Sequence, residues 1–170
     1  MQMEKTSSSS SSSLPLPQKW KLWAHLPKES SWSMESYVEV ADLHTAEDVV
    51  GVFQSLPAEL IQNCMLFLMK DGINPMWEDP QNCKGGSFSY KISNKFVADV
   101  FKLLAYHVCG TTLVGTQEFN KDITGITISP KKQFCVIKVW MRSCRFQNPA
   151  VIANIANMPQ QGCLFKKHVS

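Results

Sequence analysis

The chain has 170 residues, the size of one compact domain that can bury a sizeable core. Hydrophobic residues make up 44% of it and charged residues 18%, a balance typical of a soluble globular protein and not of a disordered one. No run of about 18 apolar residues occurs, so we expect no transmembrane span. Residues 1–13 lack the apolar core of a secretory signal.

The six cysteines form no CxxC pair and no Cys/His spacing that fits a zinc site, so we expect free thiols and no metal. Several lie inside apolar runs, where a thiol serves as a small hydrophobe. A reducing compartment, the cytoplasm or also the nucleus, is the natural location. The four histidines have no nucleophile or carboxylate at a suggestive spacing, so we expect no catalytic site and no cofactor.

Charge divides the chain unevenly. Residues 1–122 carry ten Lys or Arg and fourteen Asp or Glu, whereas residues 123–170 carry seven Lys or Arg and no acid. Such a segment indicates an anionic partner on that part of the surface. The alternative is that acids from the first part of the chain neutralise it in space.

The chain opens with a Ser-rich tail. Residues 7–13 are consecutive serines, which bury no apolar area, so we expect residues 1–13 to be disordered. No internal repeat and no second linker follows. The sequence therefore predicts one domain over residues 14–170.

Three segments have helical signals: 46–56, 95–108 and 150–157. Acids occupy the first turn of the first segment, and apolar residues recur at helical spacing in the second. Each segment lies between a capping residue and a terminator. These pairs are Thr45 and Pro57, Asn94 and Gly110, and Asn148 and Pro159.

The rest of the chain is typical of strands. Apolar and polar residues alternate over 87–92 and 134–142, and a hairpin turn at 129–132 separates the latter from the apolar run 123–128. Runs of strands with few helices between them predict an α+β fold, with about three helices packed on one face of an antiparallel sheet. Further strand candidates are 34–41, 64–69 and 111–116.

The strand at 134–142 has two different faces. One is apolar, whereas the other carries Trp140 between Lys138 and Arg142. Because the apolar face packs on the core, the second face looks outward with an indole and two cations. We interpret it as a binding face.

Two of the five tryptophans lie in polar loops, where core packing does not predict them: Trp32 in ESSWSMES and Trp77 in KDGINPMWEDP. A loop tryptophan either caps the edge of the core or awaits a ligand. Glu78 follows Trp77, and the basic segment lies downstream. Aromatic faces, a carboxylate and cations together fit a nucleotide with a stacked base, a hydrogen-bonding edge and phosphates.

At these residues the chain resembles the translation initiation factor 4E family of eukaryotes, which binds the mRNA cap. WKLW (Trp20 and Trp23) looks like the family's paired tryptophans, and KDGINPMWED is nearly its signature loop. NCKGGSF and VIKVWMRSC follow in the family's order, so the resemblance spans residues 14–165. It implies a curved antiparallel sheet with helices on its convex face and the cap site on its concave face.

The resemblance implies a site for the 7-methylguanine base. Trp32 and Trp77 occupy the positions of the two stacking tryptophans, Glu78 that of the glutamate that reads the base edge, and Trp140 that of a tryptophan against the methyl group. The methylated base is positively charged, so stacking and cation–π attraction contribute about 1–3 kcal/mol per ring. An ionised Glu78 accepts from the N1–H and N2–H of guanine, a pair that adenine does not offer.

The phosphate site departs from the family's pattern. One phosphate-binding position of the family falls at Lys131, but a second is occupied by Val136. In addition, Ser87 stands where the family usually has an arginine after the two glycines. Two cations share the face of Trp140 by strand parity, and two others lie close by in sequence. The candidate phosphate-binding residues are therefore Lys131, Lys132, Lys138, Arg142 and Arg145.

The partner surface departs too. In the family, a tryptophan on the first helix, opposite the cap site, anchors a helical motif of the scaffold factor 4G. The aligned residue here is Val50, with Ala46 one turn before it, and Leu14 and Pro15 border the same surface. The resemblance implies a monomer whose partners are capped mRNA and a scaffold of the 4G type or a divergent equivalent.

The sequence thus predicts a protein that binds the cap and breaks no bond, in translation initiation or its regulation. Two alternatives stay open. One is a repressor that sequesters capped mRNA, and the other is a protein-interaction module of the same fold with weak or lost cap binding. A decapping hydrolase is disfavoured because paired carboxylates for a metal are absent from the sequence pattern.

Overall fold

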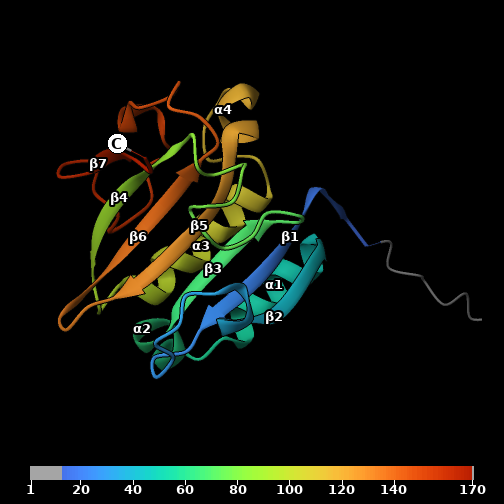
Figure 1. Cartoon of the computed structure of the whole chain (residues 1–170). Coiled ribbons are helices and arrows are strands. Elements are labelled where there is room, and N and C mark those ends of the chain that lie inside the picture. The colour runs from blue at the N-terminus through green and yellow to red at the C-terminus, as the bar shows by residue number, and fades with distance from the viewer. Residues whose placement is uncertain (1–12, 170) are drawn as a thin grey trace, which may run out of the picture.

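The computed structural model describes residues 13–169, which form an α+β fold on one curved sheet (Figure 1). Seven strands pair antiparallel in the order β2-β1-β3-β5-β6-β4-β7, which confirms the predicted fold class. The predicted disordered tail lies outside the described residues, apart from Ser13. The strands are β1 (Pro15–His25), β2 (Tyr37–Thr45), β3 (Met65–Lys70), β4 (Gly86–Ser93), β5 (Ile123–Pro130), β6 (Phe134–Met141) and β7 (Leu164–Lys167).

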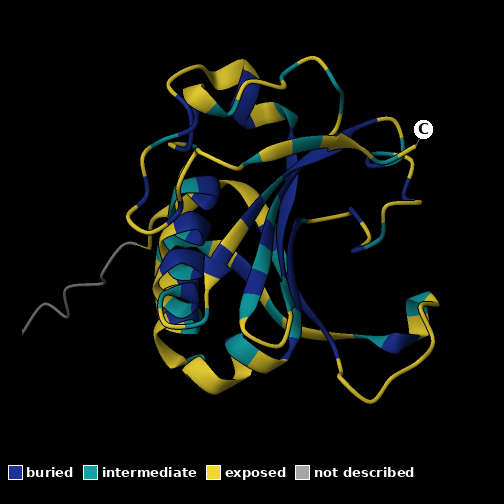
Figure 2. Ribbon diagram, turned by 90° about the vertical axis from the view of Figure 1, so that its left-hand side faces the viewer, coloured by how far each residue is buried: buried dark blue, intermediate teal, exposed yellow. Residues whose placement is uncertain are grey.

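Helices cover one face of the sheet. Figure 2 shows them to the left of the strands, while long loops project from the opposite side. The helices are α1 (Ala46–Ser55), α2 (Ala58–Asn63), α3 (Val97–Cys109) and α4 (Gln117–Asp122), with 3-10 turns η1 (Met34–Ser36) and η2 (Pro149–Val151). None of the helices within residues 13–169 is long and apolar enough to cross a membrane.

The first two predicted helices are present. Thr45 begins α1 with a capping box, because its hydroxyl accepts from the Asp48 N–H while the Asp48 carboxylate accepts from the Thr45 N–H. α3 begins at Val97, after Phe96 and not at an Asn94 cap, and ends at Gly110 as predicted. Both helices pack their apolar faces on the sheet and form the main core with it.

The predicted helix over 150–157 is wrong. Only the η2 turn at Pro149–Val151 forms, and the following residues are irregular. The backbone here bonds another segment instead, since the Ala153 N–H donates to the Leu113 carbonyl and Asn157 has a left-handed φ of 66°. The apolar spacing that imitates a helix instead places Ile152 and Ile155 in the core.

The predicted strand over 111–116 is also wrong, because this segment forms only an isolated bridge from Val114 to Ile152. The buried Asn120 amide donates to the carbonyls of Thr111 and Val114 and so satisfies backbone groups that a strand would pair. The predicted strand over 34–41 is shifted, with η1 first and β2 after it. The elements that the sequence did not predict are β1, α2, α4 and β7.

A second, smaller apolar cluster lies on the concave face of the sheet. Its members are Trp23, Phe67, Met69, Ile73 and Trp140. Of these, Phe67 and Trp140 line the site described below.

Gly85, just before β4, and Gly86, its first residue, allow three strands to approach closely. A Cβ on Gly85 would lie 1.7 Å from the Met141 carbonyl oxygen of β6, and one on Gly86 would lie 2.5 Å from the Lys166 carbonyl oxygen of β7. Both positions therefore require glycine, and their role is close packing of β4 between its neighbours.

Candidate nucleotide-binding site

A hollow of about 400 Å³ opens on the concave face, and we call it the base hollow. It brings together all four residues expected at the base: Trp32, Trp77, Glu78 and Trp140. Two of these indoles are strongly exposed, with 52% of Trp32 and 47% of Trp77 accessible, which is costly for tryptophan unless a ligand covers it. The remaining lining residues are Tyr37, Met65, Phe67, Pro75 and Met76.

Trp32 lies between β1 and β2 and is supported from behind. The His25 imidazole stacks on it with ring centroids 3.9 Å apart and planes 4° from parallel. His25 is buried, and its Nε2 donates to the Ser31 carbonyl over 2.7 Å. Tyr37 meets both rings edge-on, at centroid distances of 5.2 Å to His25 and 6.4 Å to Trp32. One face of the exposed indole is thus covered by a fixed ring, and the same indole lines the hollow.

Trp77 and Glu78 lie in the loop between β3 and β4, which two buried polar side chains hold from inside. The Asp79 carboxylate accepts from the backbone N–H groups of Asn74 and Gln81, at 2.9 Å and 2.8 Å. The Asn82 amide donates to the Met76 carbonyl over 2.9 Å and to that of Asn74 over 3.3 Å. A long loop without regular structure therefore presents these two residues from a hydrogen-bonded frame.

Glu78 is exposed at the rim of the base hollow, close to Tyr37. Burial and the Glu78 carboxylate raise the pKa of the Tyr37 phenol, in that order. The phenol therefore stays protonated across the neutral range. A single carboxylate in a hollow lined mainly by aromatic and apolar groups is suited to select a ligand that offers two adjacent N–H donors.

Trp140 forms the floor between the two loops and is only 8% exposed. Its Nε1–H donates to the Thr127 hydroxyl on β5 over 3.1 Å, which fixes the orientation of the ring. The opposite residue on β5 is Gly125, where a Cβ would lie 2.3 Å from the Met69 sulfur. This floor is rigid and apolar.

A second hollow, of about 230 Å³, adjoins the base hollow and shares Trp77 and Trp140 with it; we call it the lysine hollow. The register explains its composition, because Trp140, Ser87 and Lys166 lie opposite one another across β6, β4 and β7 and face the same side. Its other lining residues are Lys138, Lys167 and His168.

Of the predicted phosphate-binding residues, Lys138 lines the lysine hollow. Burial, then the charges of Lys131 and Lys166, lower the pKa of its ammonium group. The effect of Lys131 shows that this exposed residue of the β5–β6 turn also belongs to the cationic region. Within residues 13–169, no ion pair engages any of these three lysines. Lys132 lies exposed in the same turn.

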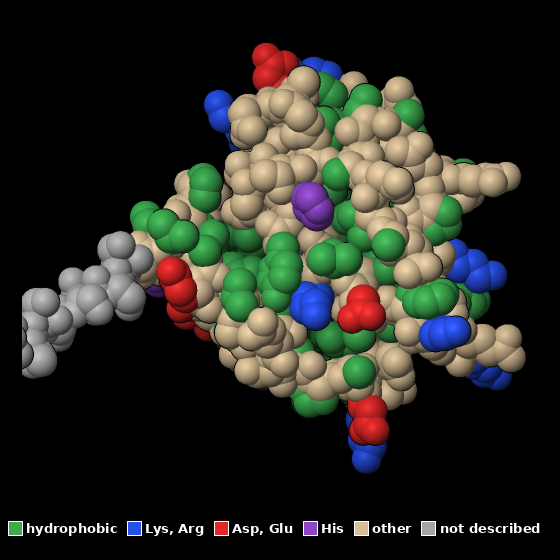
Figure 3. All heavy atoms as spheres, turned by 180° about the vertical axis from the view of Figure 1, so that it is seen from behind, with side chains coloured by type: hydrophobic (Ala, Val, Ile, Leu, Met, Phe, Trp, Pro, Cys, Tyr) green, Lys and Arg blue, Asp and Glu red, His purple; other side chains and the backbone are tan. Residues whose placement is uncertain are grey.

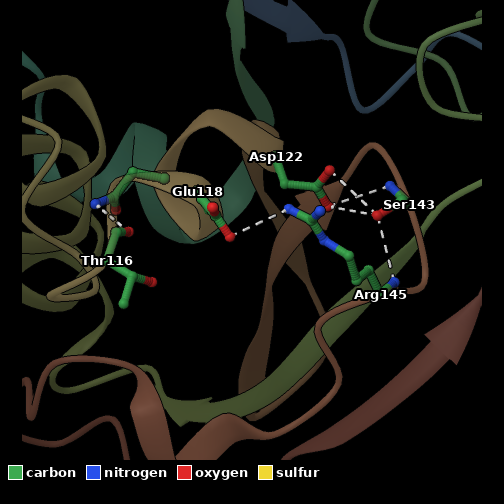
Figure 4. Close-up of polar contacts among 6 residues, drawn as sticks. Thr116, Glu118, Asp122, Ser143 and Arg145 are labelled. Carbon is green, nitrogen blue, oxygen red and sulfur yellow. Dashed lines mark hydrogen bonds and ion pairs between the residues drawn. The ribbon is translucent and has the colours of Figure 1, made fainter.

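Arg142 and Arg145 lie in a different hollow, of about 330 Å³, that shares no lining residue with the other two. There Arg145 lies 3.9 Å from the Glu118 carboxylate, and Asp122 accepts from the Ser143 hydroxyl and N–H (Figure 4). The Arg142 guanidinium donates to the Gln81 side chain over 2.9 Å. Glu118 and Asp122, from the first part of the chain, line the same hollow as these two arginines, whereas no acid lines the lysine hollow.

The expected partner surface lies on the opposite, helical face. The Ala46 N–H donates to the Leu14 carbonyl, and Pro15 pairs with Thr45, so the expected residues are neighbours. Val50 is 40% exposed on α1. Figure 3 shows hydrophobic side chains exposed among charged ones on this face.

Comparison with known proteins agrees with this geometry. The model of the family described as eukaryotic initiation factor 4E matches residues 15–168. The chain belongs to the eukaryotic initiation factor 4E family. Among curated relatives, eukaryotic translation initiation factor 4E-2 of Schizosaccharomyces pombe is 31% identical over 140 residues, which cover 76% of this chain and 54% of that protein. The chain thus spans little more than half the length of this eIF4E.

Solved eIF4E structures share the fold. C. elegans eIF4E-3, in complex with the 4E-binding protein Mextli and a cap analog, has a TM-score of 0.69 and 22% identity, covering 78% of this chain and 76% of its own. A schistosome eIF4E complexed with m7GpppA and 4E-BP has a TM-score of 0.69 and 25% identity, covering 77% of this chain and 73% of its own.

Several residues that shape the site were not found from the sequence. Asp79 and Asn82 are ordinary loop residues by pattern, although a buried carboxylate and amide in a long loop are the usual means of fixing one. The other site residues that the sequence did not predict reach the site only through contacts between distant segments, and such contacts leave no local sequence pattern. They are His25, Tyr37, Lys166, Lys167 and His168.

Proposed function

We propose that this eIF4E-family chain binds the 7-methylguanosine 5′ cap of mRNA and acts in translation initiation or its regulation. The observation that carries the proposal is the pair of exposed indoles, Trp32 and Trp77, that line one hollow with Glu78. The schistosome relative complexed with m7GpppA supports it. Affinity and specificity would be the whole activity, and no step would break a bond.

The base would stack between Trp32 and Trp77. A 7-methylated guanine carries a positive charge, so each indole contributes cation–π attraction beyond stacking, about 1–3 kcal/mol per ring. Unmethylated guanine lacks this charge and would bind more weakly. Trp140, fixed by Thr127, would lie against the methyl group as the floor of the hollow.

Glu78 would read the edge of the base. Its ionised carboxylate would accept from the N1–H and N2–H of guanine, which makes two charge-assisted hydrogen bonds. Adenine presents no such pair of donors. The cluster of Lys131 and Lys138 would attract the phosphates.

We further propose one cap-binding domain over residues 14–170 that acts in the cytoplasm as a monomer. Its protein partner would be a scaffold of the 4G type or a divergent equivalent, docked on the helical face near Leu14 and Ala46. Exposed Val50 offers only a small anchor there. If no scaffold binds, the same cap site would make the chain a repressor that sequesters capped mRNA.

Quenching of intrinsic tryptophan fluorescence by 7-methyl-GTP, with GTP as the control, tests the proposal at fixed salt. We expect strong quenching by the methylated ligand only, and its loss in Trp77→Ala. Retention of fold in the variant is checked by circular dichroism. If the two ligands do not differ, the cap-binding proposal falls and the interaction-module alternative takes its place.

A further inference from the structure

We propose that Tyr37 is a positioning residue for Glu78: when a base enters the base hollow, the Tyr37 hydroxyl donates to the Glu78 carboxylate and orients it toward the N–H donors of the base edge. This inference rests on the proposed function, because Glu78 is the residue that would read the base. The contact that Tyr37 makes is with Glu78 and not with the ligand.

The Tyr37 ring is fixed in the wall of the base hollow. Tyr37 is the first residue of β2, and the register places it beside His25 of β1. Its ring meets three other rings edge-on, with centroid distances of 5.2 Å to His25, 5.3 Å to Phe67 and 6.4 Å to Trp32. Because aromatic contacts surround the ring, the hydroxyl at its end has a defined position before any ligand binds.

The Tyr37 hydroxyl is free to take a new partner. No hydrogen bond among residues 13–169 engages it, and it is not one of their buried polar atoms that lack a partner, so the oxygen is accessible. Of the described residues that line the base hollow, Tyr37 alone carries a hydroxyl. The Trp140 N–H is already used by Thr127. The phenol is therefore a fixed and unused donor in this hollow.

The Glu78 side chain, in contrast, is not held in place. It is exposed, and no ion pair or hydrogen bond within the described part of the chain engages its carboxylate. The contacts of Asp79 and Asn82 fix the backbone of the loop and leave this side chain free to rotate. A flexible side chain loses conformational entropy when it binds, which weakens binding. A fixed donor that restricts the carboxylate reduces this loss.

The phenol and the carboxylate are close enough to interact. Both residues line the base hollow. Burial, and after it the charge of the Glu78 carboxylate, raises the pKa of the Tyr37 phenol. The phenol therefore keeps its proton at neutral pH and acts as a donor, whereas an ionised carboxylate only accepts.

The carboxylate has enough acceptor sites for both the base and the phenol. Its two oxygens offer about four lone-pair sites. The N1–H and N2–H of guanine would use one site on each oxygen, which leaves a site for the Tyr37 hydroxyl. Bonds from a hydroxyl to a carboxylate are short and strong. One such bond would hold the Glu78 carboxylate with its remaining sites toward the base edge.

A double-mutant cycle tests whether the two side chains act together. Tyr37→Phe keeps the ring and its contacts and removes the hydroxyl. We expect it to lower affinity for 7-methyl-GTP about tenfold in the unaltered chain, as for loss of a charge-assisted bond. In Glu78→Ala, where no acceptor remains, we expect it to change affinity by less than about twofold. Tyr106→Phe on α3, another half-buried tyrosine edge-on to a phenylalanine, is the matched control and should leave affinity unchanged.

A second ligand separates positioning from direct contact. 7-Methyl-ITP keeps the positive charge and the N1–H of the base but lacks the 2-amino group. If the phenol acts through Glu78, Tyr37→Phe weakens binding of both nucleotides. A loss of affinity for 7-methyl-GTP alone would mean that the phenol bonds the 2-amino group itself, and would overturn the positioning role.

A measurement without ligand does not depend on cap binding. The chain has three tyrosines, so isotope labelling of the tyrosine Cζ gives three NMR signals, and Tyr37→Phe assigns one of them. Because the Glu78 charge raises the pKa of the Tyr37 phenol, Glu78→Gln should lower that pKa. Glu59→Gln, on α2 of the helical face, is the control for the change in charge and should leave the Tyr37 pKa where it is.

The outcomes are distinct. If 7-methyl-GTP binds but Tyr37→Phe matches Tyr106→Phe, or if Tyr37→Phe has the same effect with and without Glu78, the positioning role is overturned while the base site stands. An unchanged Tyr37 pKa in Glu78→Gln would also overturn it. If 7-methyl-GTP does not bind the unaltered chain but Glu78→Gln lowers the Tyr37 pKa, the pairing of the two groups stands and the cap-binding proposal falls.

Discussion

His25 and Trp32 stack face to face, with ring centroids 3.9 Å apart and planes within 4° of parallel. The histidine is buried and hydrogen-bonded to the Ser31 carbonyl, whereas the indole is half exposed. A flexible loop tryptophan would lose conformational entropy on ligand binding. The stack removes much of that cost, because the indole that lines the base hollow is already held by the His25 ring.

Removing this support should weaken ligand binding without touching the ligand. His25→Ala is expected to lower affinity for 7-methyl-GTP about tenfold, the cost of ordering one side chain and losing one aromatic pair. His25→Phe keeps the stack and should retain most of the affinity. Fluorescence titration measures both variants, and equal affinities for Ala and Phe would show that the stack plays no part.

The edge-reading role of Glu78 is tested by Glu78→Gln, which keeps the size of the side chain. The amide NH2 would face one of the two guanine N–H donors, so we expect affinity for 7-methyl-GTP to fall about 10–100-fold, as for loss of a charge-assisted bond. Glu59→Gln on α2, an exposed acid of the helical face, is the control for the change in charge. Similar affinities in the two variants would exclude Glu78 from base recognition.

The parts of the site that the sequence predicted are those with a local signal. The indoles stand out because they lie in polar loops, and the β6 alternation places Trp140 and Lys138 on one face. Parity alone also placed Arg142 on that face. The strand ends at Met141, however, and Arg142 lines another hollow and donates to the Gln81 side chain. Periodicity is informative only while the strand continues.

The parts that the sequence did not predict depend on contacts between distant segments. In the sequence Lys166 is one of several basic residues near the end of the chain, and only the pairing of β7 with β4 places it beside Ser87. Likewise the three-residue spacing of Ile152 and Ile155 imitates a helix, although their segment bonds residues 113–114 instead. Tertiary hydrogen bonds outweighed local propensity in that segment.

Lys70 gives the fold a distinctive response to pH. Its Nζ donates to the Lys121 and Asn120 carbonyls, over 3.0 Å and 3.3 Å, and burial lowers its pKa to about 8. The unfolded chain keeps the ordinary pKa of 10.5, so it binds more protons between these values, and this group's contribution to stability rises with pH there.

We therefore expect the stability of Lys70→Met, measured as its free energy of unfolding minus that of the unaltered chain, to be highest below about pH 8. Below this pH the unaltered chain must keep a charge in a buried place, whereas the variant carries none. That relative stability should decline as the pH rises toward 10.5. Urea denaturation at several pH values measures it, and titrations common to both chains cancel. A pH-independent difference would contradict the shifted pKa.

Gly85 and Gly51 form a matched pair for the role of glycine in this fold. A Cβ on Gly85 would clash with the Met141 carbonyl oxygen at 1.7 Å, so Gly85→Ala must move β4 away from β6. We expect it to lower the free energy of unfolding by about 1–3 kcal/mol, as for an overpacked core. Gly51, within α1, has nothing within 4 Å of an added Cβ. Gly51→Ala should therefore raise stability by about 0.5–1 kcal/mol through helix propensity alone.

Urea denaturation measures the stability of both variants. Because β4 carries Ser87 beside Trp140, only Gly85→Ala should also weaken binding of 7-methyl-GTP. A Gly85→Ala protein as stable as the unaltered chain would show that β4 and β6 are free to separate without cost.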